Sequence, residues 1–263
     1  MFRQRLLTTL VLVPLVLLMI YQANAWLVGA VVLLLVLAGG WEWLQLIPVR
    51  QLVNQCIFIV VLLLATWLCQ YYFHFWLILS LVLWAMILLA VLTFPTSQET
   101  WGNRAIVGGA CLLLLSVFAN TLAAIYLHTK GKDLIVYLLC IVWATDIGAY
   151  LAGKYCGRHK LIPKVSPGKT IEGATGGFVL AMIVAAVAYW YFSPQQLSLW
   201  FAVAVGTALI SMLGDLFISM LKRRSNIKDT GQIIPGHGGI LDRLDSLIAA
   251  APLFYYGIFF VSF

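Results

Sequence analysis

The sequence predicts an all-α, polytopic integral membrane protein. Of its 263 residues, 63% are hydrophobic and only 10% are charged, whereas a soluble domain is typically about half apolar and about a quarter charged. The apolar residues are gathered in long runs, and a helix needs about 20 such residues to cross a membrane. A water-soluble fold of this size could not bury so much apolar surface, so the surrounding solvent is expected to be lipid.

Nine apolar segments are candidates for membrane-spanning helices. The first two are short and are expected to form a tight hairpin, and a nine-span chain places its two termini on opposite sides of the membrane. The segments are 6–21, 25–40, 53–70, 74–94, 105–126, 134–153, 173–193, 198–220 and 244–262.

The first segment also has features of a cleavable signal peptide. Arg3 and Arg5 precede the apolar run, and Ala23-Asn24-Ala25 has the small residues of a cleavage site. A second apolar run follows at once. An uncleaved helical hairpin is therefore the simpler interpretation.

The distribution of basic residues predicts the orientation. If the N-terminus lies in the cytoplasm and the spans alternate, 14 of the 16 Lys and Arg residues fall on the inner side, and only Lys130 and Lys132 fall on the outer side. This follows the positive-inside rule and places the C-terminus outside. In a soluble protein the net charge of +7 would favour nucleic-acid binding. Here membrane topology explains the charge, so no nucleic-acid partner is expected.

Two inner loops, 154–172 and 221–243, carry most of the basic charge and are rich in Gly and Pro, so they are expected to be irregular. The chemistry is therefore expected within residues 140–246. Residues 1–130 would form scaffold helices and 131–263 the catalytic region, within one membrane domain. The chain has no repeat period and no inverted pair of broken helices, which argues against a transporter.

Carboxylates are concentrated in the same region. Six of the nine lie between positions 146 and 245, and Asp146 and Asp215 fall inside predicted spans. An ionised group at membrane depth costs several kcal/mol unless it is paired or reaches a watery cavity. One such residue could simply tie helices together by an ion pair. Two of them beside basic loops favour a functional site.

The spacing of these acids favours a magnesium site. Asp215, Ser219 and Lys222 share one face of the eighth span, while Asp242 and Asp245 are three residues apart at the start of the ninth. The loop between the two spans can fold back and bring the acids together near the cytoplasmic surface. Carboxylates, phosphate oxygens and water are the ligands that Mg²⁺ prefers, and we expect Asp215, Asp242 and Asp245 to bind it.

Cysteine and histidine residues do not indicate zinc or disulfides. Four of the five cysteines lie in apolar runs, and none belongs to a CxxC pair. His237 has no Cys or His partner nearby in the sequence. A lone histidine is more often a hydrogen-bonded structural residue than a catalytic base, and both roles remain open for it.

The segment from Ser166 to Gly173 is expected to bind phosphate. Gly168-Lys169-Thr170 matches the end of a P-loop, but Pro163 stands where the first glycine is needed and no preceding strand is expected. A glycine-containing loop that enters a helix still presents free N–H groups to an anion, and Lys169 adds a point charge. Arg158 and Lys160 are better explained by contact with anionic lipid head groups.

Residues 219–245 resemble the signature of phosphatidate cytidylyltransferases. Ser219-Met220-Leu221-Lys222-Arg223 is followed by Lys228-Asp229 and then by the run from Pro235 to Asp245, without a departure from the pattern. The resemblance is strong over residues 140–246, whereas the first 130 residues match mainly in hydropathy. Further upstream, the similar stretches are Asp146 to Tyr150, Gly153-Lys154, Ser166 to Gly173, and Gly214-Asp215.

This resemblance implies synthesis of CDP-diacylglycerol and diphosphate from CTP and phosphatidate, with Mg²⁺ required. It also implies a helical fold in the inner membrane with a cytoplasmic funnel, often as a homodimer. The implied catalytic residues are Asp215, Lys222, Asp242, Lys169 and Arg243. The implied substrate-binding residues are Asp146, Ser166, Gly168, Lys169, Thr170, Ser219, Lys222, Arg223, Lys228, Asp229, His237, Gly238 and Gly239.

Three alternatives remain at this stage. The enzyme could be a cytidylyltransferase or a kinase for another lipid, because the basic loops recognise phosphates and say little about the lipid tails. An ion-coupled transporter would also carry acids inside its spans, but its charges would be spread across the membrane depth. A non-catalytic relative is disfavoured by the intact signature.

Overall fold

The structure is a computed structural model that describes residues 2–47, 49, 51–231 and 238–261, with side chains described from residue 11 onward. Its described part contains nine helices of at least 18 residues, one short helix and one two-stranded sheet. The long helices are α1 (Phe2–Gln22), α2 (Ala25–Trp43), α3 (Leu52–Tyr71), α4 (Phe73–Thr93), α6 (Arg104–Tyr126), α7 (Gly131–Cys156), α8 (Ile171–Phe192), α9 (Leu197–Arg224) and α10 (Leu241–Ile258). The short elements are α5 (Gln98–Trp101), β1 (Lys160–Ile162) and β2 (Ser166–Thr170).

The prediction of a polytopic helical membrane fold is confirmed. Seven of the long helices are long and apolar enough to cross a membrane. The exceptions are α1, whose described apolar part is only Val11–Gln22, and α10, whose first turns are charged. Nine spans is therefore an approximate count.

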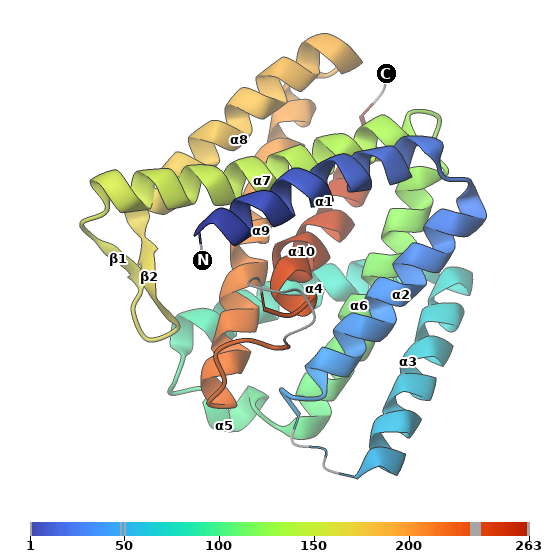
Figure 1. Cartoon of the computed structure of the whole chain (residues 1–263), viewed down its shortest axis with the longest axis vertical. Coiled ribbons are helices and arrows are strands. Elements are labelled where there is room, and N and C mark those ends of the chain that lie inside the picture. The colour runs from blue at the N-terminus through green and yellow to red at the C-terminus, as the bar shows by residue number, and fades with distance from the viewer. Residues whose placement is uncertain (1, 48, 50, 232–237, 262–263) are drawn as a thin grey trace.

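Polar contacts define two ends of the helical bundle (Figure 1). At one end, Asp133 accepts hydrogen bonds from the hydroxyl groups of Tyr21, at 2.7 Å, and Tyr191, at 3.0 Å. At the other end, Arg224 donates to the carbonyl oxygens of Gly102 and Leu46. We call the second end the hairpin end, because the β1–β2 hairpin also lies there (Figure 1). The loops that were predicted to be basic meet at this end.

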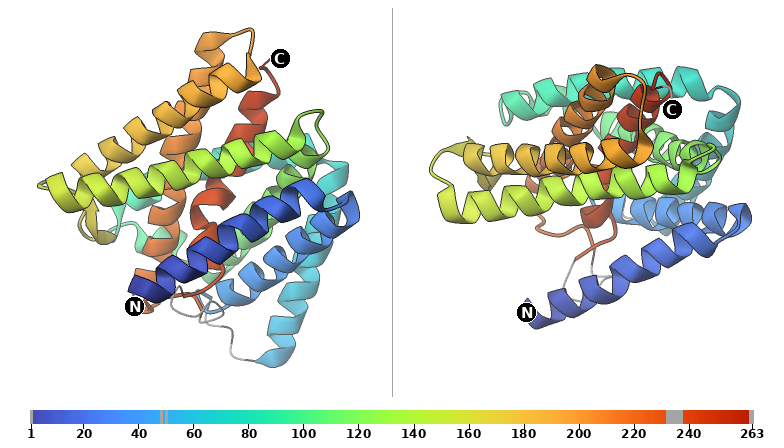
Figure 2. Two further views of the ribbon diagram at one scale, coloured as in Figure 1. Left: turned by 45° about the horizontal axis from the view of Figure 1, so that its top comes forward. Right: turned by 90° about the horizontal axis from the view of Figure 1, so that it is seen from above.

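The helix that carries the last three charged residues lies in the centre of the molecule. Most of α10 is buried, and the ribbon places it among α9, α6, α4 and α2 (Figures 1 and 2). A half-buried polar helix start can exist there because protein, and not lipid, surrounds it. In Figure 2, α1 lies at the margin of the bundle, beside α7.

Glycines allow α7 and α8 to pack with their backbones in contact. A Cβ atom at Gly148 would overlap with the carbonyl oxygen of Gly176, and one at Gly177 would overlap with that of Thr145. Small residues permit such close approach between helices in membranes. The pairing fixes the end of α7, with Asp146, against the start of α8 at the hairpin end.

The prediction that loop 154–172 is irregular is wrong. Its strands β1 and β2 form an antiparallel pair with Lys160 opposite Thr170 and Ile162 opposite Ser166. The Glu172 side chain anchors the hairpin by accepting a hydrogen bond from the backbone N–H of Arg158, at 3.0 Å, and by pairing with His159 Nδ1, at 2.6 Å. The hairpin is short, so its backbone pairing leaves no clear period in the sequence.

Candidate active site

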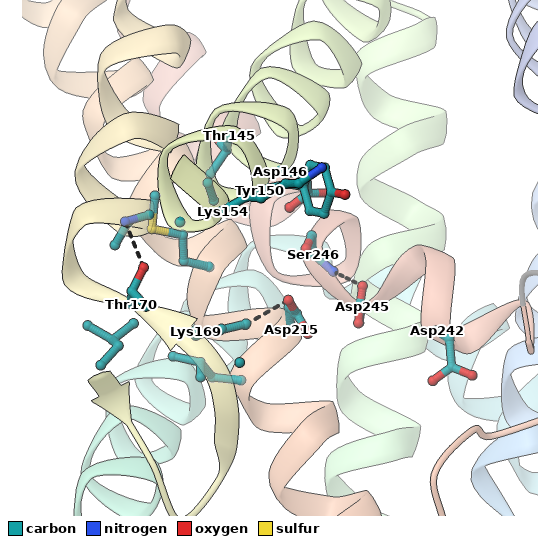
Figure 3. Close-up of a pocket in the computed structure, with 18 of the residues that line it drawn as sticks. Thr145, Asp146, Tyr150, Lys154, Lys169, Thr170, Asp215, Asp242, Asp245 and Ser246 are labelled. Carbon is teal, nitrogen blue, oxygen red and sulfur yellow. Dashed lines mark hydrogen bonds and ion pairs between the residues drawn. The ribbon is translucent and has the colours of Figure 1, made fainter. Parts of the chain in front are cut away.

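A cavity of about 570 Å³ opens at the hairpin end, between α7, β2, α8, α9 and the start of α10 (Figure 3). Its volume lies within the range of about 300–1,000 Å³ that is usual for small-molecule sites. The cavity brings together segments that are about 100 residues apart in the chain. The predicted site residues that line it are Asp146, Gly168, Lys169, Thr170, Asp215, Lys222, Asp229, Asp242, Arg243 and Asp245.

Lys169 reaches the cavity from the end of β2. Its Nζ lies 2.6 Å from Oδ2 of Asp215 on α9, and both side chains are partly exposed. Ser219, one turn further along α9, donates to the other Asp215 oxygen at 3.3 Å. Asp215 and Ser219 therefore share a face of α9, as predicted, and the hairpin places the Lys169 ammonium group against that face.

Lys222 and Asp242 form a second, less exposed pair. Lys222 Nζ lies 2.7 Å from Asp242 Oδ1, and the Asp242 side chain is only 6% exposed. Asp242 Oδ2 accepts from the backbone N–H groups of Thr230, at 2.9 Å, and Gly239, at 3.1 Å. The Asp242 carboxylate thus connects the end of α9 and the start of α10 with both ends of the loop between them.

Three acids from three helices face the same cavity. Asp245 is buried and accepts from the backbone N–H of Ser246 at 2.8 Å, whereas Asp146 on α7 is exposed to the cavity. Gly214 lets α9 and α10 approach, because a Cβ there would overlap with the Asp245 carbonyl oxygen. Asp215 and Asp245 consequently lie close together in Figure 3. Gathered like charges repel one another, so this arrangement favours a cation between them.

Among the described residues, no three acidic, His or Cys side chains form a group that could hold a metal ion by themselves. Mg²⁺ commonly uses only one or two protein carboxylates and takes its other ligands from substrate phosphates and water. Asp215 and Asp245, as hard oxygen donors beside several cations, fit that mode of binding.

The other described site residues from the prediction are not among those that line the cavity. Arg223 donates from Nε to the Val165 carbonyl oxygen at 3.4 Å, which ties α9 to the hairpin. Gly238 has φ +83°, a conformation that favours glycine. His237 falls outside the described residues. The remaining predicted residues of this group are Ser166, Ser219, Lys228 and Gly239.

The segment that is predicted to bind phosphate differs from its expected structure in one respect. A strand does precede the helix, because β2 ends at Thr170 directly before α8 begins. The Thr170 hydroxyl oxygen accepts from the backbone N–H of Gly173 at 3.1 Å and so caps α8. Gly168 has open space where a side chain would be, so its backbone is accessible from the cavity.

Comparison with known proteins identifies the family of the chain. The family model described as "Cytidylyltransferase family" matches residues 3–261. The chain belongs to the cytidylyltransferase family. It is 39% identical to a phosphatidate cytidylyltransferase of Pseudomonas aeruginosa over 97% of this chain and 96% of the relative. It is 34% identical to one of Haemophilus influenzae over 99% of this chain and all of the relative. A Staphylococcus aureus phosphatidate cytidylyltransferase is 42% identical over 57% of this chain and 60% of its own length.

Lys154 is a cavity residue that is absent from the predicted site. Lys154 lines the cavity and lies 5.9 Å from the ring centre of Tyr150, which also lines it. Both residues fall in the stretches that resemble the family upstream of the signature. The available signal in the sequence was their spacing, because residues four apart lie on the same face of a helix and can form a cation–π contact.

Glu42 on α2 was placed in the scaffold, yet it contacts the signature segment directly. It is 1% exposed, and its carboxylate accepts hydrogen bonds from the backbone N–H groups of Ile240, at 2.9 Å, and Leu241, at 2.7 Å. The available signal was an acid directly after an apolar run. The predicted second span stopped at residue 40, so Glu42 was counted outside the membrane.

Proposed function

We infer that this integral membrane protein transfers the cytidylyl group of CTP to phosphatidate and makes CDP-diacylglycerol. A phosphate oxygen of phosphatidate attacks the α-phosphorus of CTP. The bond from that phosphorus to the oxygen that bridges it to the β-phosphate breaks, and diphosphate leaves. The family membership of the whole chain, together with a cavity lined by both acids and cations, supports this reaction.

The cations of the cavity match the main difficulties of the reaction. The attacking phosphate is already anionic at neutral pH, so the reaction needs no strong general base. It needs relief of the repulsion between two anions and stabilisation of the charge on diphosphate, which preorganised cations provide. Lys169, Lys222 and Arg243 line the cavity and can contact phosphate oxygens. Their carboxylate partners hold Lys169 and Lys222 in place before substrate binds.

Mg²⁺ is the proposed cofactor. Asp215 and Asp245 face the cavity, and Asp242 is a third ligand candidate, although its oxygens already accept three hydrogen bonds. When bound, the ion would neutralise phosphate charge and polarise the bond to the leaving diphosphate. The protein's own contribution is to hold these acids at the cavity, close to the cations that would bind phosphate.

We further propose that the hairpin end faces the cytoplasm, where CTP is available. The described basic residues lie mainly there, while Lys130 and Lys132 lie at the opposite end with Asp133. This distribution follows the positive-inside rule. In this orientation the cavity would lie at the cytoplasmic membrane surface, where a lipid head group and a soluble nucleotide can meet.

Labelling of single cysteines tests this orientation. In a variant that lacks the five native cysteines, Lys164→Cys in the hairpin turn and Gln195→Cys at the opposite end would each present one exposed thiol. In sealed spheroplasts, an impermeant maleimide should label Gln195→Cys and should label Lys164→Cys only after the membrane is opened. The reverse pattern would contradict the orientation and the access of CTP to the cavity.

A panel of substrates tests the reaction itself. Purified protein with Mg²⁺ should release diphosphate when CTP and phosphatidate are both present, and should be much slower with ATP. Equal or faster turnover with another lipid phosphate, or with a lipid alcohol and ATP, would instead support the alternative cytidylyltransferase or the lipid kinase.

A further inference from the structure

We propose that Glu42 is a positioning residue for the transfer reaction, which fixes the start of α10 and thereby the acids and the arginine that α10 places in the cavity. This inference rests on the proposed function. Glu42 itself does not line the cavity, and it lies on α2, in the part of the chain that resembles the family least. Its role therefore has to be argued from its contacts.

The Glu42 carboxylate acts as the missing cap of α10. The residue that precedes this helix, Ile240, provides no side-chain cap. Two N–H groups at the helix start, those of Ile240 and Leu241, donate to Glu42 oxygens. The first N–H groups of a helix have no partner within the helix, and a carboxylate is favoured at that end by the helix dipole. A side chain from another helix thus does what a local Ser or Asp usually does.

Two short segments connect Glu42 to Asp242. Thr230 donates its backbone N–H to Asp242 Oδ2 and its hydroxyl to Glu42 Oε2, at 3.2 Å. On the other side, the N–H of Gly239 is donated to Asp242, and the next two N–H groups are donated to Glu42. The two carboxylates are therefore held by donors from the same two segments. A shift of Glu42 would move these segments and with them Asp242, which is the partner of Lys222.

The packing around Glu42 leaves it little freedom. A Cβ atom at Gly231 or Gly239 would overlap with a Glu42 carboxylate oxygen. The close approach to Glu42 gives a structural reason for a glycine at position 239 of the signature. Thr230 is fully buried in the same cluster. A buried carboxylate is costly to leave without hydrogen-bond donors, so its donors and its position are mutually fixed.

The direct test is Glu42→Gln. The side chain keeps its volume, but an NH₂ group, which cannot accept a hydrogen bond, replaces one of the two accepting oxygens. We expect kcat per folded molecule to fall about 10–100-fold, as when a reacting geometry is misplaced. Backbone amides of residues 238–246 should exchange hydrogen faster by mass spectrometry. Thr230→Val, which removes only the hydroxyl bond to Glu42, should change both quantities in the same direction by a smaller amount.

Asp133→Asn is the matched control, because it removes a carboxylate that ties Tyr21 and Tyr191 together at the opposite end. It should lower the melting temperature without changing kcat per folded molecule or exchange at 238–246. The inference is overturned if Glu42→Gln keeps kcat and this exchange within about twofold of wild type, or if Asp133→Asn causes the same changes. If wild-type protein does not act on phosphatidate, the proposed function fails. The exchange measurement would still decide whether Glu42 fixes the start of α10.

Discussion

Asp215→Asn is expected to lower kcat/KM by about 10²-fold or more while the protein stays folded. Asp215 faces the cavity, pairs with Lys169 at 2.6 Å and accepts from Ser219. Asparagine keeps the volume but removes the charge that would hold Mg²⁺ and orient Lys169. Activity should be measured with CTP and phosphatidate over a range of Mg²⁺ concentrations, together with the melting temperature in detergent.

Glu99→Gln provides the matched control for this substitution. Glu99 is an exposed acid in α5, at the hairpin end but outside the cavity. Its loss should leave kcat/KM within about twofold of wild type, because a screened surface charge contributes little. If Asp215→Asn retained more than about a tenth of wild-type activity, Asp215 would not be an essential ligand, since the loss of a key charge stabiliser costs about 10²-fold or more.

Lys169→Met and Lys222→Met form the second prediction, and each should lower kcat/KM by about 10²-fold or more. Both lysines line the cavity and both are held by carboxylates, at 2.6 and 2.7 Å. Lys222→Met also leaves Asp242 without its cation, so some loss of stability is expected. Activity should therefore be expressed per folded molecule, as measured by monodisperse elution in detergent.

Arg158→Met and Lys160→Met are the controls for the lysine prediction. Both residues lie at the start of the hairpin, are exposed and do not line the cavity. They should change activity by less than about tenfold, through weaker attraction to anionic lipid worth ~1 kcal/mol per charge. Equal losses in all four variants would show that each acts only as one more cation at a membrane surface.

The long helices could be predicted from hydropathy, although their ends could not. The sixth predicted span, 134–153, lies within α7, which runs from Gly131 to Cys156, and the eighth, 198–220, lies within α9, which ends at Arg224. Hydropathy marks the apolar part of a helix. The backbone hydrogen bonds continue into polar turns, where basic side chains such as Lys154 and Arg223 are exposed at the surface.

The site could be predicted where its residues lie close in sequence or share a helix face. The stripe of Asp215, Ser219 and Lys222 follows from helical spacing, and the nearness of Asp242 follows from a connecting loop that folds back. The Lys169–Asp215 pair and the Glu42 contacts join segments that are far apart in the chain, so no local pattern indicates them. The homodimer and the role of His237 stay predictions.

The fate of the α- and γ-phosphates of CTP tests the central claim most directly. Purified protein should be incubated with Mg²⁺, phosphatidate and CTP labelled either on the α- or on the γ-phosphate, and the lipid then extracted. We predict that α-label enters the lipid in a one-to-one ratio with released diphosphate, and that γ-label stays in the water phase as diphosphate. Transfer of γ-label to lipid, or retention of α-label in the water phase, would contradict the account.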